Sequence, residues 1–144
     1  MVDLANVHLA TLTDLYSHTK QAHWNVKGKD FYQLHELFDK LAAVLEEQID
    51  MVAERATALG GTALGTVRLA AANSKLAEYP HDIFDGKAHL EALTERWGVY
   101  AGLAVRAIEE ADKAGDADTA DLFTEVSREI DKGLWFLESH LIGA

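Results

Sequence analysis

Residues 31–58 read FYQLHELFDKLAAVLEEQIDMVAERATA, and this stretch decides the fold. Its apolar side chains recur three, four or seven positions apart, which places them on one face of a helix. They include Leu34, Leu37, Phe38, Leu41, Leu45, Ile49, Val52 and Ala56. Gly60-Gly61 follows as a strong helix-terminating signal, and Asp30 stands where a capping residue is expected. The stretch therefore predicts one helix of roughly 29 residues, about 43 Å long.

The remainder of the chain repeats this helical periodicity and shows no alternating strand pattern. Three more long helices are predicted over residues 3–26, 86–114 and 118–139. Residues 62–80 are small and weakly polar and end in the only proline, so we expect a long crossover with a short helix near residues 66–72. Four long helices with one crossover between the second and the third predict an all-α, ferritin-like four-helix bundle. The length of 144 residues predicts a single domain, residues 1–144.

Composition excludes several kinds of site and partner. Cysteine is absent, which excludes disulfides, thiol nucleophiles, zinc fingers and iron–sulfur clusters, so a metal site must use nitrogen and oxygen ligands. The formal net charge of −11 disfavours nucleic acid as a direct ligand and attracts cations. No apolar run is long enough to span a membrane, and the sequence from Met1 lacks the basic region of a signal peptide. We therefore expect a cytoplasmic protein.

Four side chains of metal-ligand type share a stripe on the helix predicted over residues 31–58. They are His35, Asp39, Asp50 and Glu54. Each pair is spaced i, i+4, and all four fall within roughly a 100° arc. Eleven residues from Asp39 to Asp50 correspond to about 16 Å along the axis, too far for one metal centre. The pairs can meet if the helix packs antiparallel against a second copy across a two-fold axis, with His23 joining from the first helix.

Two imidazoles and three carboxylates suit iron, manganese or zinc, but not copper(I). Carboxylates favour Fe(III) over Fe(II), so such a centre would assist iron oxidation, and Trp24 beside it carries an oxidisable ring. A second interpretation needs no metal. A histidine at a helix contact, such as His35, is more often a hydrogen-bonded core residue, and Asp50 and Glu54 beside Arg55 fit a solvated, salt-bridged face.

Three segments carry a resemblance to a known family. They are HWNVKG at residues 23–28, HELFD at 35–39 and DMVAER at 50–55. This pattern resembles the Dps family, the DNA-binding proteins from starved cells, also called mini-ferritins. The intervals agree: a second histidine twelve residues after the first, then an aspartate four later, an aspartate eleven later and a glutamate four later. ALGG at 58–61, DTAD at 118–121 and LWFLE at 134–138 are similar to the family as well.

The resemblance implies a hollow homododecamer built from two-fold dimers, which binds, oxidises and stores iron, with Fe²⁺ and hydrogen peroxide as substrates. It implies that His23, His35 and Asp39 of one subunit share a ferroxidase centre with Asp50 and Glu54 of its partner. Trp24 then takes up oxidising equivalents. Zinc is a competitor for such His/carboxylate centres. The other histidines, His8, His18, His81, His89 and His140, are expected to be surface or packing residues.

Three aspartates mark the turn between the third and fourth long helices: Asp116, Asp118 and Asp121. The resemblance implies that they lie near a three-fold pore that guides Fe²⁺ inward. Carboxylates in a first helical turn also cap the helix and complement its dipole, and both roles can hold together.

The sequence departs from the family in its basic segments. No Lys-rich N-terminal tail or basic C-terminal extension is present; the first lysine is Lys20 and the last basic residue of the Lys/Arg type is Lys132. We therefore expect weak or no direct DNA binding. The leading hypothesis is an iron-oxidising storage cage. The alternatives are a nucleoid-associated, DNA-compacting protein with secondary iron chemistry, and a plain bundle or zinc-bound cage with little oxidation.

Overall fold

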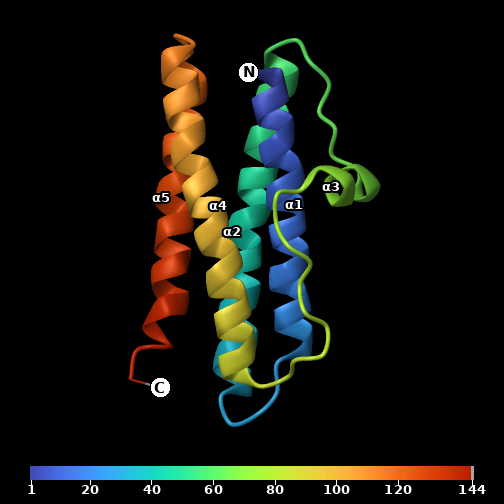
Figure 1. Cartoon of the computed structure of the whole chain (residues 1–144), viewed down its shortest axis with the longest axis vertical. Coiled ribbons are helices and arrows are strands. Elements are labelled where there is room, and N and C mark those ends of the chain that lie inside the picture. Colours follow the sequence, from blue (N-terminus) through green and yellow to red (C-terminus); the bar gives the residue numbers. More distant parts are fainter. Residues whose placement is uncertain (144) are drawn as a thin grey trace.

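A computed structural model describes residues 1–143 and shows five helices (Figure 1). They are α1 (Val2–Asn25), α2 (Phe31–Ala58), α3 (Val67–Asn73), α4 (Gly86–Lys113) and α5 (Ala117–Ser139). The long helices α1 and α2 form one antiparallel pair, and α4 and α5 form the other. The crossover runs along the outside of α1 and carries α3. The predicted all-α bundle with a short helix in its crossover is confirmed.

Side-chain caps begin three of the helices. Thr66, Asp85 and Asp116 each accept a hydrogen bond from a backbone N–H in the first turn of α3, α4 and α5, respectively. Asp30 occupies the predicted N-cap position of α2, but its side chain makes no capping hydrogen bond. Its backbone angles, φ −103° and ψ 21°, depart from the extended conformation that aims a capping side chain at the first-turn amides.

Large apolar side chains fill the space between the two helix pairs. The fully buried set includes Leu12, Phe38, Leu45, Leu93, Trp97, Tyr100, Phe123 and Ile130. One close approach depends on glycine: a Cβ at Gly133 of α5 would lie 2.4 Å from Cζ3 of Trp97. The absence of a side chain at Gly133 therefore lets α5 pack directly against the largest core ring.

Polar contacts fix the crossover to the bundle. The Ser74 hydroxyl donates to the Asp14 carboxylate at 2.6 Å, and the Lys75 N–H donates to the Thr11 hydroxyl. Just beyond the C-terminal end of α1, the Lys27 N–H donates to the Phe84 carbonyl at 2.7 Å. This bond ties the turn between α1 and α2 to the start of α4. None of the helices within residues 1–143 is long and apolar enough to cross a lipid bilayer.

Candidate metal centre

The corner between α1 and α2 brings two of the predicted ligands together. His23 lies in the last turn of α1 and His35 in the first turns of α2. The Nδ1 of His23 lies 2.6 Å from the His35 carbonyl oxygen, and the Nδ1 of His35 lies 2.7 Å from the His23 carbonyl oxygen. The two rings stack with centroids 3.8 Å apart. We call this arrangement of His23 and His35 the histidine corner.

The hydrogen bonds of the histidine corner decide which ring nitrogens are free. A carbonyl oxygen can only accept, so each Nδ1 carries the hydrogen and donates it. Each neutral ring then keeps its lone pair on Nε2, the atom that can bind a metal. Histidine ligands of metals characteristically donate their other N–H to a carbonyl or carboxylate in this way. The folded chain therefore leaves the Nε2 atoms of both rings without a backbone hydrogen bond, as a metal ligand requires.

Asp39 completes this part of the site from the next turn of α2. Its Oδ1 lies 3.8 Å from the Nε2 of His23 and 2.8 Å from the Nζ of Lys20. The hydrogen bond from Lys20 is the main cause that lowers the pKa of Asp39, and the same bond raises the pKa of Lys20. Asp39 is thus held as a carboxylate beside the imidazole lone pair.

Lys20 is the site residue that the sequence analysis missed. It lies three positions before His23 on α1, a spacing that places both side chains on one face of the helix. Its ammonium group also lies 5.5 Å from the centroid of the Trp24 ring. Trp24 itself is 65% exposed, so its indole stands at the surface beside the corner and does not belong to the core.

The other two predicted ligands lie elsewhere on α2. Asp50 and Glu54 are exposed and line separate surface hollows. Along the helix, Asp50 is about 16 Å and Glu54 about 22 Å from Asp39. Within residues 1–143, no group of three or more His, Cys, Asp or Glu side chains is placed to hold a metal ion. One chain therefore places His23 next to His35 and next to Asp39, without forming a complete three-ligand site, and it leaves Asp50 and Glu54 apart from them.

The three aspartates at the α4–α5 turn divide into two kinds. Asp116 caps α5 through the Thr119 N–H at 3.0 Å and pairs with the Arg55 guanidinium at 3.1 Å. Its hydrogen bonds to Thr119 lower its pKa first, and Arg55 lowers it further. Asp118 and Asp121 are exposed and line a hollow of about 490 Å³ together with Glu54. Arg55, expected as a possible partner of Asp50 and Glu54, is instead bound to Asp116.

Comparison with known proteins gives the chain its family. Residues 2–142 match the ferritin-like domain family. The chain is 47% identical over 141 residues to the DNA protection during starvation protein of Agrobacterium fabrum, covering 98% of this chain and 87% of that relative. The chain belongs to the Dps proteins of the ferritin-like family.

Solved Dps structures share this fold. Dps from Vibrio cholerae, described as a member of a broad superfamily of ferritin-like diiron-carboxylate proteins, matches with a TM-score of 0.91 at 27% identity, over 97% of this chain and 87% of that chain. Dps from Listeria innocua soaked with zinc matches with a TM-score of 0.92 at 30% identity, over 99% and 97%. Family membership supports iron storage and protection as the general role of this Dps chain.

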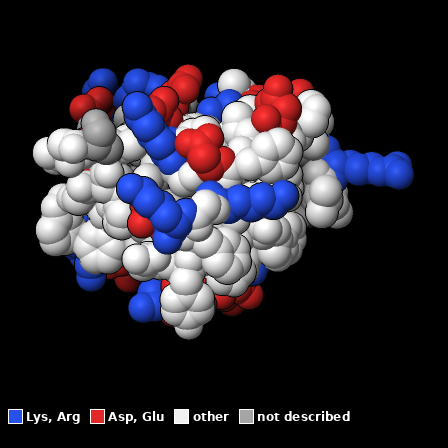
Figure 2. Space-filling view, turned by 90° about the horizontal axis from the view of Figure 1, so that it is seen from below, with Lys and Arg blue, Asp and Glu red and all other residues white. Residues whose placement is uncertain are grey.

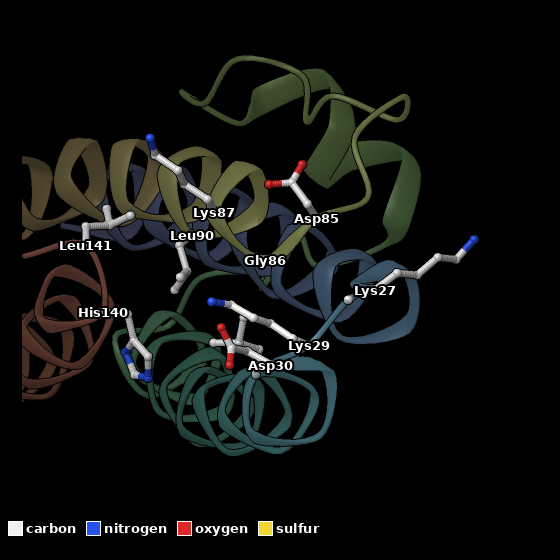
Figure 3. A pocket seen from close by; sticks show the side chains of 11 residues that line it. Lys27, Lys29, Asp30, Asp85, Gly86, Lys87, Leu90, His140 and Leu141 are labelled. Carbon is white, nitrogen blue, oxygen red and sulfur yellow. The ribbon is translucent and has the colours of Figure 1, made fainter. Parts of the chain in front are cut away.

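A separate hollow lies at the lower end of the bundle, apart from the predicted ligands of this Dps chain. It measures about 350 Å³ and lies where the α1–α2 turn meets the start of α4 and the end of α5 (Figure 3). Lys29, Lys87 and His140 are among its lining residues. Figure 2 shows that Lys and Arg side chains on this end are interspersed with carboxylates and with uncharged surface. The end is therefore of mixed charge, without a continuous basic face.

Proposed function

We propose that this chain is an iron-storage and detoxification ferroxidase. It oxidises Fe(II), preferably with hydrogen peroxide, at centres shared between subunits and keeps the ferric mineral inside a hollow dodecamer built from two-fold dimers. By removing iron and peroxide together it protects the cell from oxidative damage. Membership of the Dps proteins supports the general role, and the histidine corner carries the proposal to particular residues.

The histidine corner supports metal binding because its hydrogen bonds set the ligands before a metal arrives. The Nδ1 groups of His23 and His35 both donate to carbonyl oxygens, which leaves two Nε2 lone pairs, that of His23 lying 3.8 Å from the Asp39 carboxylate. Two imidazoles and carboxylate oxygen suit ferrous iron. This donor set also suits zinc, so zinc competes with iron at the same centre.

The geometry of α2 supports sharing of the centre between subunits. One chain offers an imidazole half, made of His23, His35 and Asp39, and a carboxylate half, made of Asp50 and Glu54. The halves are about 16 Å apart along one helix, whereas an antiparallel second copy of α2 brings opposite halves together. Because a two-fold contact repeats itself, one dimer then holds two complete centres.

The chemistry of the proposed centre is a one-electron oxidation of each Fe(II). Hydrogen peroxide accepts two electrons and two protons and becomes two molecules of water. The carboxylates of Asp39, Asp50 and Glu54 favour the trivalent product, because hard oxygen anions bind the higher charge more strongly. Trp24 stands next to His23 as an oxidisable ring that takes up an oxidising equivalent left at the centre.

An acidic surface leads iron toward the same ligands. Asp118 and Asp121 share a hollow with Glu54, so ferrous ions attracted to the α4–α5 turn reach a proposed ligand along one face. We assign these two aspartates to the pore that admits Fe²⁺. Asp116 joins them with its carboxylate already paired to Arg55, so its contribution is the smallest of the three.

We propose that this protein works in the cytoplasm and binds DNA weakly or not at all. Its net charge of −11 opposes contact with phosphates, and the lysines of the lower end are interspersed with carboxylates. The alternative is a nucleoid-associated protein that compacts DNA and has secondary iron chemistry. A tight complex in a gel-shift assay at low salt without Mg²⁺ would favour that alternative.

The deciding experiment supplies the purified full chain with Fe²⁺ and hydrogen peroxide. We expect ferric absorbance to form faster than in buffer alone, and we expect the iron to remain soluble and to elute with a particle of twelve subunits. Dioxygen in place of peroxide should give slower oxidation. Oxidation at the rate of buffer alone, or iron that elutes apart from the protein, would refute the proposal.

A further inference from the structure

A buried phenol–imidazole pair lies outside the proposed iron ligands. Tyr79 follows α3 in the crossover, and His89 lies in the first turn of α4. The Tyr79 hydroxyl is 2.7 Å from the Nδ1 of His89, and the two rings stack with an interplanar angle of 16°. Tyr79 is 7% exposed and His89 is 1% exposed. Solvent therefore does not separate the phenol from the imidazole.

The hydrogen of this bond belongs to the phenol. Burial lowers the pKa of His89 and raises that of Tyr79, so the pair consists of a neutral imidazole and a neutral phenol. The phenol hydrogen has only the Nδ1 of His89 as its acceptor within residues 1–143. The imidazole hydrogen is then on Nε2, which is buried and has no hydrogen-bond partner within residues 1–143. The Ile83 backbone raises the pKa of this ring, against the lowering by burial. The geometry fits a proton transfer from Tyr79 to His89.

The surroundings favour that transfer when Tyr79 is oxidised. The Arg96 guanidinium lies 5.3 Å from the centroid of the Tyr79 ring, and it holds the neighbouring Glu78 carbonyl at 2.6 Å. A positive charge on the ring would be repelled by this guanidinium, so the oxidised ring must lose its proton and become a neutral radical. The Asp85 carboxylate favours the imidazolium that forms on His89.

Tyr79 shares one surface hollow with Trp24, the neighbour of His23 in sequence. Tyr79 and Trp24 both line a hollow of about 740 Å³ on the outer side of α1. Lys20 lines it too, and its ammonium lies 5.5 Å from the Trp24 ring and 2.8 Å from Asp39. Trp24, which lies next to the proposed ligand His23, and Tyr79 thus border the same hollow.

We propose that Tyr79 is an electron donor to oxidised Trp24 and that His89 receives its proton. The inference rests on the proposed function, which supplies hydrogen peroxide as the oxidant and Fe²⁺ as the first reductant. Reduction of one peroxide needs two electrons. Where only one Fe²⁺ is present, it supplies the first electron and Trp24 supplies the second, and Tyr79 then reduces the oxidised Trp24. In sum, one peroxide, one Fe²⁺, the Tyr79 phenol, the His89 imidazole and two solvent protons give two waters, Fe³⁺, a Tyr79 phenoxyl radical and the His89 imidazolium.

The test combines rapid freezing with electron paramagnetic resonance. The full-length protein is mixed with one Fe²⁺ per subunit and then with peroxide. We expect a tyrosyl signal that is lost in Tyr79→Phe and in Trp24→Phe. The matched control is Tyr16→Phe, because Tyr16 lines the same hollow and has no histidine partner in the described structure; it should keep the signal. In His89→Gln the signal should decay faster or shift in g-value. An unchanged tyrosyl signal in Tyr79→Phe or in Trp24→Phe would overturn the proposal.

A second arm separates this inference from the iron chemistry. Iron-free protein is oxidised by a flash-generated ruthenium(III) trisbipyridine complex, which withdraws an electron from exposed Trp24 without any metal at the centre. We expect the same Tyr79 signal, again lost in Tyr79→Phe. A flash-induced signal without accelerated iron oxidation would uphold the electron transfer and refute the ferroxidase proposal. Accelerated iron oxidation without a Tyr79 signal in either arm would refute the electron transfer alone.

Discussion

The two halves of the proposed centre are built in opposite ways. In the imidazole half, two carbonyl hydrogen bonds orient His23 and His35, and Lys20 holds Asp39. In the carboxylate half, Asp50 and Glu54 are exposed, and within residues 1–143 their side chains make no hydrogen bond or ion pair in the structure. The contrast indicates that one half is organised by its own chain, whereas the other is left free for a ligand or partner to organise.

The strongest way to break this comparison is to remove one ligand from each half. We expect His35→Ala and Asp50→Ala each to slow the fast phase of iron oxidation by on the order of a hundredfold, because both halves complete one centre. Stopped-flow absorbance with Fe²⁺ and peroxide measures the rate. Light scattering should show an unchanged particle mass. If a variant keeps the fast phase, the residue substituted in it is not a ligand of the centre.

Mixing those two variants tests whether the halves belong to different chains. Refolding His35→Ala and Asp50→Ala together forms mixed dimers in which one of the two centres has every ligand intact. With random pairing we expect about a quarter of the wild-type fast phase to return. The control mixes His35→Ala with His23→Ala, which share a half and should restore nothing. No recovery in the first mixture would place the centre within a single chain.

A histidine outside the histidine corner, His8, is expected to make the stability of the fold depend on pH. Burial lowers the pKa of His8 from 6.5 to about 4 while its ring contacts the Tyr100 hydroxyl at 2.8 Å. The unfolded chain binds this proton more readily, so stability is present above pH 6.5 and falls as pH drops toward 4. We expect a loss of about 2 kcal/mol between pH 7 and pH 5 from this residue. Urea unfolding at fixed protein concentration measures this loss. In His8→Gln, the free energy of unfolding should fall by about 2 kcal/mol less between pH 7 and pH 5 than in the wild-type protein.

Stability of the iron-free protein should separate the two halves. We expect His23→Ala to lower the free energy of unfolding by about 1 kcal/mol, because one corner hydrogen bond and buried packing are lost. Glu54→Ala should change it by less than about 0.5 kcal/mol, because that side chain is exposed. Urea titrations without metal compare the two variants. Equal losses would mean that both halves are organised to the same extent.

The smallest expected effect concerns Lys20. An incoming metal must displace its ammonium from Asp39, so Lys20→Met should raise the affinity for Zn²⁺ by no more than about fivefold, the effect of an exposed ion pair. Calorimetric titration of the metal-free protein with Zn²⁺ measures this change in affinity. Lys40→Met is a matched control, because Lys40 follows Asp39 in sequence but makes no ion pair in the described structure. A weaker affinity for zinc in Lys20→Met would show that Lys20 assists binding.

The fold could be predicted almost completely because local patterns specify it. The spacing of apolar side chains predicts all four long helices, and Gly60 and Gly115 end two of them in the left-handed backbone conformation expected of a helix-terminating glycine. Asp30 shows the limit of that reasoning. Its residue type suits a cap, but its backbone angles decide whether the side chain reaches the amides, and those depend on how the turn is fixed to α4.

The candidate site could be predicted only in part. Helical spacing groups His35 with Asp39, but the hydrogen bonds that orient His23 and His35 cross between two segments, and no local pattern reveals them. Lys20 could have been found from its i, i+3 spacing to His23. The Arg55–Asp116 pair joins residues 61 positions apart, beyond the reach of local reasoning. The assignments of Asp50 and Glu54 as shared ligands remain predictions.

The reciprocal hydrogen bonds of the histidine corner couple the orientations of its two rings. Each ring is oriented by the main chain that carries the other ring, so unwinding the last turn of α1 releases both rings at once. A metal ion that fixes both rings must therefore also suppress fraying of the last turn of α1. Metal loading should be visible as slower amide hydrogen exchange across residues 23–35, and warming that loosens this segment should expel the ion well before the bundle melts.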